Sequence, residues 1–372
     1  MIKKIRKQMR RVIRFVKSLY WEKKGYDRGM YSIVQRDMEE AYDGSPLPVK
    51  QKRWAVKRGF FPYHVQQYGL TEENYKNIIS DWDYGYLFRL NNYYRELIIN
   101  KLFSWYTLAP FREYLPKHYY HLVRERGILR LADCPEEFEP SLDGIVDLIR
   151  SIGTAALKET HGWHGEGFYR IRSVGEGFEV NDKTLTEEEF RTFLSGLDEY
   201  IITDYIKMHP VMENLNPCSV NTIRVVAINE HGNDPVIPSA YMRIGTKKSG
   251  TTDNVGAGGM FCKVDVETGR FYDAEVLNNH VTTKVTHHPD TNALLEGTIP
   301  HWELAKSVII QICNYIPDLE WLGFDIAITP ESICVVEINS TQDLHKAHEY
   351  PEAINGYLFR KLKKKKEKYG VK

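Results

Sequence analysis

The chain has 372 residues, of which 42% are hydrophobic and 27% charged, and its formal net charge at pH 7 is zero. These values are those of a globular protein with two or three subdomains. Five scattered cysteines without a Cys-x-x-Cys pair argue against a disulfide framework or a zinc knuckle and fit a reducing cytoplasm. No apolar run reaches the length of a membrane span, and cations recurring through the N-terminal stretch leave no signal-peptide core.

Charge is concentrated at the two ends. Residues 1–24 contain ten lysines and arginines against one glutamate, a net charge of +9, and residues 360–372 carry +7. We expect residues 1–24 to form a basic amphipathic helix, because apolar residues recur on one stripe. The stripe comprises Ile2, Ile5, Met9, Val12, Ile13, Val16 and Tyr20. Such a helix suits an anionic membrane surface, but it equally suits packing on the protein with a solvated cationic face.

Residues 25–135 are expected to be mostly helical and are rich in tyrosine and tryptophan. Asp81-Trp82-Asp83 resembles the acidic triplet with which many glycosyltransferases hold a metal-bound nucleotide sugar, although three residues are a weak signal. No nucleic-acid partner is expected.

From about residue 136 the pattern changes to mixed α and β structure. Lys158 lies on an expected strand directly before the loop HGWHGEG, which contains Gly162, Gly165 and Gly167. Glycines let the backbone approach a ligand and present N–H groups to an anion, and a lysine beside them suits nucleotide phosphates. An ordinary hairpin would explain the same residues.

The next strand, IITDYIKMHP, ends near an expected hinge. Backbone groups of residues 203–206 (Thr203, Asp204, Tyr205 and Ile206) could read an adenine ring there, although a plain core strand has the same pattern.

Two strands near the C-terminus place polar groups where a plain hairpin needs none. Asp325 lies on one expected strand, and Glu337 and Asn339 lie on the next. Alternation along a strand puts Glu337 and Asn339 on the same face. Two carboxylates and an amide on adjacent strands point to a metal–nucleotide site. Upstream, Arg224 lies within an otherwise apolar strand, where it needs a partner.

The segments NTIRVVAI, YMRIG, DNVGAGG, GFDIAI and VVEINS resemble, in order and spacing, the catalytic half of ribosomal-protein glutamate ligases. Those enzymes belong to the ATP-grasp superfamily of carboxylate–amine ligases. In finer detail, NPCSVNTIRVV and DNVGAGGMFCKVDVETGRF resemble the sugar-transfer-associated ATP-grasp proteins, which are typically encoded among surface-polysaccharide genes.

The resemblance implies an α+β fold in which two subdomains grip ATP, preceded by a helical region. It implies a mobile lid at residues 136–205, a catalytic subdomain at 206–350 and a basic tail at 351–372. Two Mg²⁺ ions would be held by Asp325, Glu337 and Asn339. Lys101 and Lys158 would hold the α- and β-phosphates, and Arg224 and Arg243, with Asn254 beside them, would act on the γ-phosphate and the acyl phosphate.

The implied reaction begins with attack of a carboxylate on the γ-phosphate of ATP, and an amine then displaces phosphate from the acyl phosphate. The expected substrates are a carboxylate, such as a uronic acid of a cell-surface polysaccharide or its precursor, and an amine. The alternatives are an ATP-dependent kinase and a non-ligating nucleotide-binding partner of a glycosyltransferase complex. The fold alone does not choose among these functions. The expected location is the cytoplasm, with the possibility of attachment to the inner face of the membrane.

Overall fold

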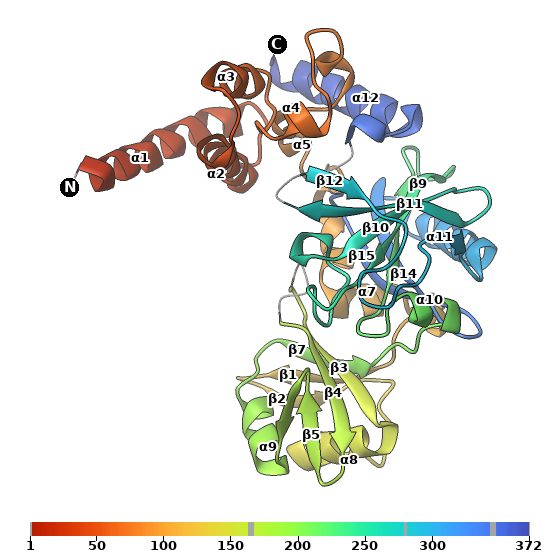
Figure 1. The fold of residues 1–372 in the computed structure, drawn as a ribbon. Helices are drawn as coiled ribbons and strands as arrows, with labels where there is room; N and C mark the ends of the chain where they lie inside the picture. The colour runs from red at the N-terminus through yellow and green to blue at the C-terminus, as the bar shows by residue number, and fades with distance from the viewer. Residues whose placement is uncertain (1, 163–166, 279–280, 343–346, 372) are drawn as a thin grey trace. The chain divides into compact units, whose positions relative to one another are not determined.

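The computed structural model describes residues 2–162, 167–278, 281–342 and 347–371 (Figure 1). The chain divides into two compact units. Unit 1 comprises Met1–Tyr93, Asn279–Val281 and Thr341–Lys372, and unit 2 comprises Tyr94–Asn278 and Thr282–Ser340.

Unit 1 is helical in the part of it that the structure describes. Its α-helices are α1 (Ile2–Lys23), α2 (Arg28–Gly44), α3 (Val49–Lys57), α4 (His64–Gln67), α5 (Asp81–Tyr86) and α12 (Glu352–Tyr369). Short 3₁₀ turns are η1 (Tyr75–Asn77), η2 (Asn92–Arg95), which continues into unit 2, and η5 (Ala347–Glu349). Within the described ranges, no helix combines the length and the hydropathy needed to cross a bilayer.

The basic tail expected at residues 351–372 is a helix packed into unit 1. Ile354, Tyr357, Leu358 and Leu362 of α12 are buried, because their spacing places them on one side of the helix. Two lysines near the C-terminal end of the helix also contact unit 1: Lys366 forms an ion pair of 2.8 Å with Asp83, and Lys365 donates a 2.6 Å hydrogen bond to the Tyr86 carbonyl. The high lysine content of this segment made its apolar stripe difficult to identify from the sequence.

Unit 2 contains two antiparallel sheets. In the described part of the chain, seven strands form the first in the order β2-β1-β7-β3-β4-β5-β6. These strands are β1 (His118–Val123), β2 (Gly127–Arg130), β3 (Thr154–Glu159), β4 (Tyr169–Val174), β5 (Gly177–Val180), β6 (Lys183–Leu185) and β7 (Tyr200–Asp204). The sheet therefore includes β1 and β2, which precede the lid boundary expected at residue 136.

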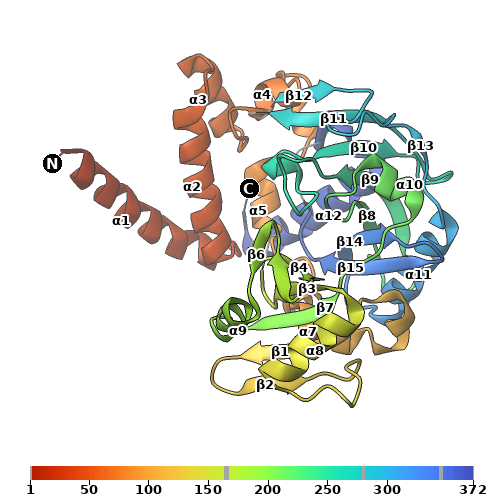
Figure 2. The same ribbon diagram turned by 60° about the horizontal axis from the view of Figure 1, so that its bottom comes forward.

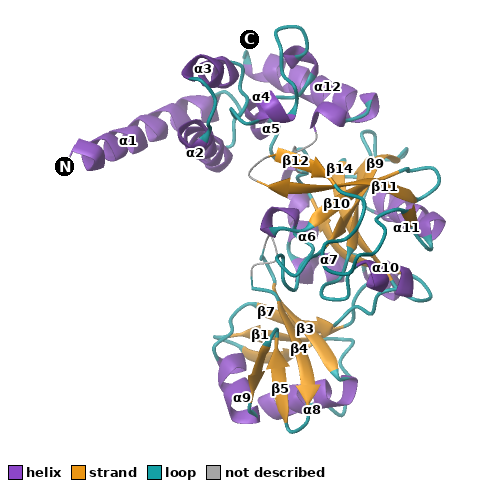
Figure 3. Ribbon diagram, in the orientation of Figure 1, coloured by secondary structure: helices purple, strands orange, loops and turns teal. Residues whose placement is uncertain are grey.

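Helices α8 (Leu142–Ile152) and α9 (Glu187–Ser195) pack on this sheet (Figure 3). Their buried apolar residues share one core with strand residues such as Leu157 and Ile202. Helix α9 begins with a capping box, in which Thr186 and Glu189 bond each other's backbone N–H groups. Three glutamates, Glu187, Glu188 and Glu189, form the first turn of this helix.

The second sheet follows the order β12-β11-β10-β9-β8-β14-β15, with β13 paired to β11, over the residues described. Its strands are β8 (Thr222–Ile228), β9 (Val236–Ile244), β10 (Met260–Val264), β11 (Arg270–Asn278), β12 (Val281–Lys284), β13 (Gly297–Thr298), β14 (Trp321–Ile328) and β15 (Ile333–Asn339). Unit 2 also holds α6 (Glu96–Ile99), α7 (Lys101–Thr107), η3 (Ala109–Tyr114), α10 (Pro210–Leu215), η4 (Val255–Ala257) and α11 (Trp302–Tyr315).

The largest core of unit 2 lies between α11 and one face of the second sheet. Ile309 and Ile312 of α11 are buried in one cluster with Val225, Met242 and Phe324 of the strands. Apolar side chains therefore occupy alternate positions along β8, β9 and β14 and leave the other face of these strands for polar groups. The α+β fold with a helical N-terminal region, expected from the sequence, is confirmed.

One buried histidine makes the stability of unit 2 depend on pH. His118 lies in β1, stacks on Trp105 and donates from Nδ1 to the Pro116 carbonyl at 2.9 Å. Burial lowers its pKa from 6.5 to about 4. Between these values the unfolded chain binds a proton that the folded chain does not, so stability falls as pH falls from 6.5 towards 4.

We expect the free energy of unfolding to decrease by about 2 kcal/mol between pH 7 and pH 5 through His118 alone. Urea unfolding at both pH values measures the change. His118→Asn should reduce this decrease, whereas His231→Asn, at an exposed histidine, should leave it as in the wild type. An unchanged pH dependence in His118→Asn would contradict the assignment.

Candidate functional site

Strand pairing in the second sheet brings the polar residues of four strands together. Asp325 of β14 lies opposite Arg224 of β8 on one side and opposite Glu337 of β15 on the other. Arg243 of β9 lies opposite Thr222 of β8. Residues opposite each other on neighbouring strands point to the same face, so these side chains share the face that lies away from α11.

A β-bulge lies beside this site. Asp325 pairs with Glu337, but the next residue, Ile326, pairs with Val335, so Val336 is an extra residue in β15. Glu337 and Asn339 lie on the site face, whereas Val335 joins the core with Ile326. Glu337 and Asn339 therefore lie on the same face, as expected. The bulge lets Val335, two residues before Glu337, face the core on the opposite side.

Asp325 is the most buried member of the site, with 1% of its surface exposed. Arg224 donates from Nε to Oδ1 at 2.5 Å and from Nη2 to Oδ2 at 3.1 Å, and Arg243 Nη2 lies 2.9 Å from Oδ2. Burial alone would raise the pKa of this carboxyl, but the two guanidinium groups outweigh burial and hold it well below its usual range. Asp325 is thus a buried anion held between two cations.

Asp253, the first residue of the segment DNVGAGG and without a role assigned from the sequence, extends this cluster. Thr222 donates to its Oδ2 from the hydroxyl at 2.5 Å and from the backbone N–H at 3.0 Å. Arg243 Nε lies 3.5 Å from the same oxygen. Burial raises the pKa of Asp253 in spite of Arg243.

The neighbouring Asn254, predicted as catalytic, takes part in a turn. Its side chain accepts a 2.9 Å hydrogen bond from the Gly256 N–H at the start of η4. The carboxylate beside Arg243 comes from Asp253 instead. This contact depends on the pairing of β8 with β9, which places Thr222 beside Arg243 and which the residue pattern does not reveal.

Glu337 and Asn339 form the accessible edge of the site. The Glu337 side chain is 33% exposed and its Oε2 lies 3.9 Å from Lys101 Nζ. The Asn339 amide nitrogen donates to Glu337 Oε1 at 3.1 Å and to Asp325 Oδ2 at 3.3 Å. One amide thus joins the exposed carboxylate to the buried one.

Two lysines from other elements lie near these carboxylates. Lys101 begins α7 and donates from Nζ to the Gly162 carbonyl at 2.7 Å. Lys158 lies on β3, as expected. Burial lowers the pKa of Lys158, and the positive charge of Lys101 adds to that effect, whereas Glu337 and Asp204 oppose it. Lys101, Lys158 and Glu337 therefore interact electrostatically.

The glycine loop is described only in part. Gly165 lies outside the described residues. The Gly162 carbonyl accepts a hydrogen bond from Lys101. The sequence prediction concerned a different group, the backbone N–H groups of the loop, which were expected to bind phosphate. Gly167 has a φ of +66°, and a Cβ atom there would lie 2.6 Å from the Glu159 carboxylate, so this position favours glycine.

The expected adenine-binding segment divides into two parts. Thr203 and Asp204 belong to β7 and pair with β3, and Asp204 donates its N–H to the Lys117 carbonyl at 3.1 Å. Tyr205 and Ile206 follow the strand, and Ile206 packs with Ala327 and Cys334. Asp204 Oδ1 is buried and has no hydrogen-bond partner among the residues that the structure describes. Burial also raises the pKa of this carboxyl.

The donor set can be compared with the ligands that Mg²⁺ prefers, which are oxygen atoms of carboxylates, amides and water. Glu337 and Asn339 fit, because an accessible carboxylate and an amide lie side by side on one strand. Asp325 is already held by two guanidinium groups, so direct binding of an ion would have to replace one of these contacts. In the described ranges, no group of three or more histidine, cysteine, aspartate or glutamate side chains forms a further candidate metal site.

A family described as sugar-transfer associated ATP-grasp matches residues 115–352. The chain belongs to this family. The match spans both sheets of unit 2 and confirms the resemblance and the ATP-grasp fold inferred from the sequence. No curated protein matches this member of the family.

Solved structures similar to this ATP-grasp protein include the ligase PsnB complexed with a minimal precursor, with 10% identity, a TM-score of 0.37 and coverage of 73% of this chain and 63% of PsnB. N5-carboxyaminoimidazole ribonucleotide synthetase in complex with ADP has 12% identity, a TM-score of 0.35 and coverages of 67% and 46%. D-alanine–D-alanine ligase from Bacillus anthracis has 12% identity, a TM-score of 0.37 and coverages of 73% and 69%. The chain spans less than two thirds of the length of the first two proteins. Sequence identities and TM-scores this low carry no argument about function.

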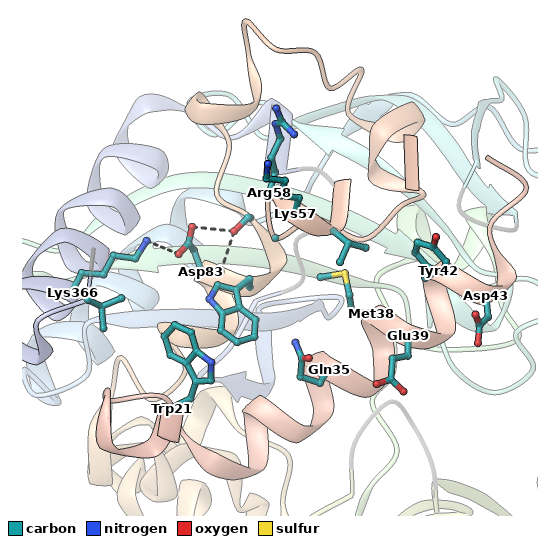
Figure 4. A pocket seen from close by; sticks show the side chains of 15 residues that line it. Trp21, Gln35, Met38, Glu39, Tyr42, Asp43, Lys57, Arg58, Asp83 and Lys366 are labelled. Atoms are coloured by element: carbon teal, nitrogen blue, oxygen red, sulfur yellow. Dashed lines mark hydrogen bonds and ion pairs between the residues drawn. The ribbon is translucent and has the colours of Figure 1, made fainter. Parts of the chain in front are cut away.

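Unit 1 contains a cavity of its own, of about 710 Å³ (Figure 4). Trp21, Trp82 and Met38 line it together with Asp83, whose carboxylate accepts from Ser80 at 3.0 Å and pairs with Lys366. The other carboxylate of the acidic triplet, Asp81, is buried 2.9 Å from His64 Nδ1. The two carboxylates have separate partners, which is unlike a shared metal site.

The two facing carboxylates of β14 and β15 should differ sharply in their effect on stability. Asp325→Asn would remove the anion that the buried Arg224 and the partly buried Arg243 share, and we expect it to lower the free energy of unfolding by about 3–5 kcal/mol. Glu337→Gln, at an accessible carboxylate, should cost less than about 1 kcal/mol. Urea unfolding of both variants measures the difference. Equal costs would show that the buried pairing is not what stabilises this part of the sheet.

Proposed function

We propose that this ATP-grasp protein is an ATP-dependent ligase that joins a carboxylate to an amine through an acyl phosphate. The observation that supports it most is the gathering of Asp325, Glu337 and Asn339 with two arginines on one sheet face, within reach of Lys101. This arrangement offers oxygen ligands for Mg²⁺ and cations for phosphate oxygens.

The nucleotide would lie between the two sheets of unit 2. Lys101 and Lys158 are cations suited to phosphate oxygens, and the buried Asp204 Oδ1 is suited to accept a hydrogen bond from a ligand N–H or O–H group. The peptide groups of Tyr205 and Ile206 lie beyond the end of β7 and outside its ladder. Mg²⁺, held by Glu337 and Asn339 with Asp325 behind them, would neutralise phosphate charge.

In the proposed reaction a substrate carboxylate oxygen attacks the γ-phosphorus of ATP, the bond to the β-phosphate oxygen breaks, and ADP leaves. An amine nitrogen then attacks the acyl carbon, and the bond between this carbon and the bridging oxygen breaks. Phosphate leaves with that oxygen, and the nitrogen loses a proton to solvent. Both steps require charge neutralisation and positioning, so the chain need not supply a nucleophile. Arg224 and Arg243 would stabilise the negative charge that develops on the transferred phosphoryl group.

The proposed carboxylate is a uronic acid or a related acid on a cell-surface polysaccharide or its precursor, with the reaction in the cytoplasm, where ATP is available. The family description, sugar-transfer associated, supports the glycan class.

A trapping experiment tests the reaction class. The protein is incubated with ATP, Mg²⁺, a uronic acid and hydroxylamine, which captures acyl phosphates as hydroxamates. A ligase forms ADP, phosphate and hydroxamate together, and omission of the acid abolishes all three. A kinase forms ADP and a stable phosphorylated acid without hydroxamate, and a binding module forms none of these products. With a panel of acids, ADP formation without hydroxamate would overturn the proposal.

Glu337→Gln should remove the accessible carboxylate while retaining the fold. We expect ADP formation to fall by about a hundredfold or more, because a neutral amide is a poorer Mg²⁺ ligand and carries no charge. Steady-state ADP formation measures the loss, and circular dichroism checks the fold. Wild-type turnover in this variant would remove Glu337 from the proposed metal site.

Lys101→Met and Lys158→Met should each weaken ATP binding about tenfold, or roughly 1.4 kcal/mol, since each removes one cation facing the phosphates. Binding of adenosine, which has no phosphates, should change little. Titration calorimetry of both ligands measures the contrast. Lys183→Met, at an exposed lysine of β6, is the matched control and should bind ATP like the wild type. Equal losses for adenosine would indicate a general structural effect instead.

A further inference from the structure

Helix α1 turns a polar side towards α2. Arg14 pairs with Glu39 of α2 at 2.7 Å, and Ser18 is 1% exposed and donates to the Phe15 carbonyl. Arg14 and Ser18 are four residues apart and therefore lie on the same side of the helix. This packed side therefore includes polar groups that a helix of a globular protein normally turns to solvent, together with Trp21, whose ring packs against Trp82.

The opposite side of α1 exposes large apolar side chains. Val12 and Val16 are each 59% exposed, and Leu19 is exposed as well. At 100° per residue these three lie about half a turn away from Arg14 and Ser18. Ile13 and Tyr20 are exposed beside them. The predicted stripe also includes Ile2, Ile5 and Met9, which lie outside the described side chains. From residue 12 onwards the stripe thus faces away from the rest of unit 1, the reverse of an ordinary amphipathic helix.

The charge around this apolar face is strongly positive. Residues 1–24 carry +9, whereas residues 25–372 carry −9, since the whole chain is neutral. Arg11 and Lys17 flank the apolar face in the helical order, one on each side. Figures 1 and 2 both show α1 joined to its unit at the C-terminal end, with its N-terminal part extending away from α2.

We propose that α1 binds the surface of an anionic bilayer. Val12, Val16 and Leu19 enter the boundary between headgroups and acyl chains, and the flanking cations bind lipid phosphates and carboxylates. Charge complementarity identifies the occupant, because the apolar face lies within the most basic segment of the chain. A second copy of α1 fits less well, since two such segments would repel each other. This inference concerns unit 1 and is independent of the ligase chemistry proposed for unit 2.

Sedimentation with vesicles tests this proposal on the full chain. The protein should pellet with phosphatidylcholine vesicles that contain phosphatidylserine, remain in the supernatant with phosphatidylcholine alone, and be released as salt is raised. Val16→Asp removes an exposed apolar group and adds a negative charge. We expect it to lower the bound fraction severalfold while ADP formation and circular dichroism remain as in the wild type.

Val49→Asp is the matched control, because Val49 is a 54% exposed valine at the start of α3, in the same unit. It makes the same chemical change and should leave vesicle binding intact. Equal binding of Val16→Asp and the wild type, or no binding of either, overturns the proposal. A concentration-dependent dimer that Val16→Asp dissociates, without vesicle binding, would identify a second copy as the occupant and likewise overturn it. Glu337→Gln should bind vesicles normally, so failure of the ligase proposal does not affect this test.

Discussion

The buried ion cluster around Asp325 positions the rest of the candidate site. A carboxylate with 1% exposure is unfavourable unless charged donors surround it, and Arg224 and Arg243 supply them. Because Asp325 contacts both guanidinium groups, and Asp253 also lies near Arg243, their orientation is set before any ligand arrives. Asn339 then connects this rigid cluster to Glu337, where the site becomes accessible. Such prior ordering is what charge stabilisation by fixed groups requires.

The sequence allowed the centre of the site to be predicted because the signal there is local. Asp325 and Glu337 lie on two strands separated by a short turn, and polar residues at such positions have few structural explanations. The need of Arg224 for a partner was also visible, since it interrupts an apolar strand. Lys158 could be placed on a strand because its immediate neighbours in the sequence have a strand pattern that ends at the glycine-containing loop. The resemblance then supplied the family, which the match over residues 115–352 confirms.

Other features depend on packing between distant segments, which residue patterns do not reveal. Asp253 joins the cluster through Thr222, a contact that exists because β8 and β9 pair. Residues 351–372 were expected to be a tail because their lysines dominate the composition, yet the buried Ile354, Tyr357, Leu358 and Leu362 dock the segment as a helix. The strands β1 and β2 join a sheet whose other members follow later in the chain, so the boundary expected at residue 136 missed them.

The bulge at Val336 has a consequence for how this part of the chain tolerates change in length. Core residues such as Val335 and site residues such as Glu337 would share one face in a regular strand, and the extra residue gives each group its own face. Removing Val336 would leave a regular ladder that keeps Asp325 opposite Glu337 and Ile326 opposite Val335, so each group would stay on its own face. Loss of a different residue of β15 would instead move either the core residues or the carboxylate to the wrong side. During divergence of the chain, the bulge residue itself can therefore be lost, whereas the number of residues in β15 on either side of it is constrained.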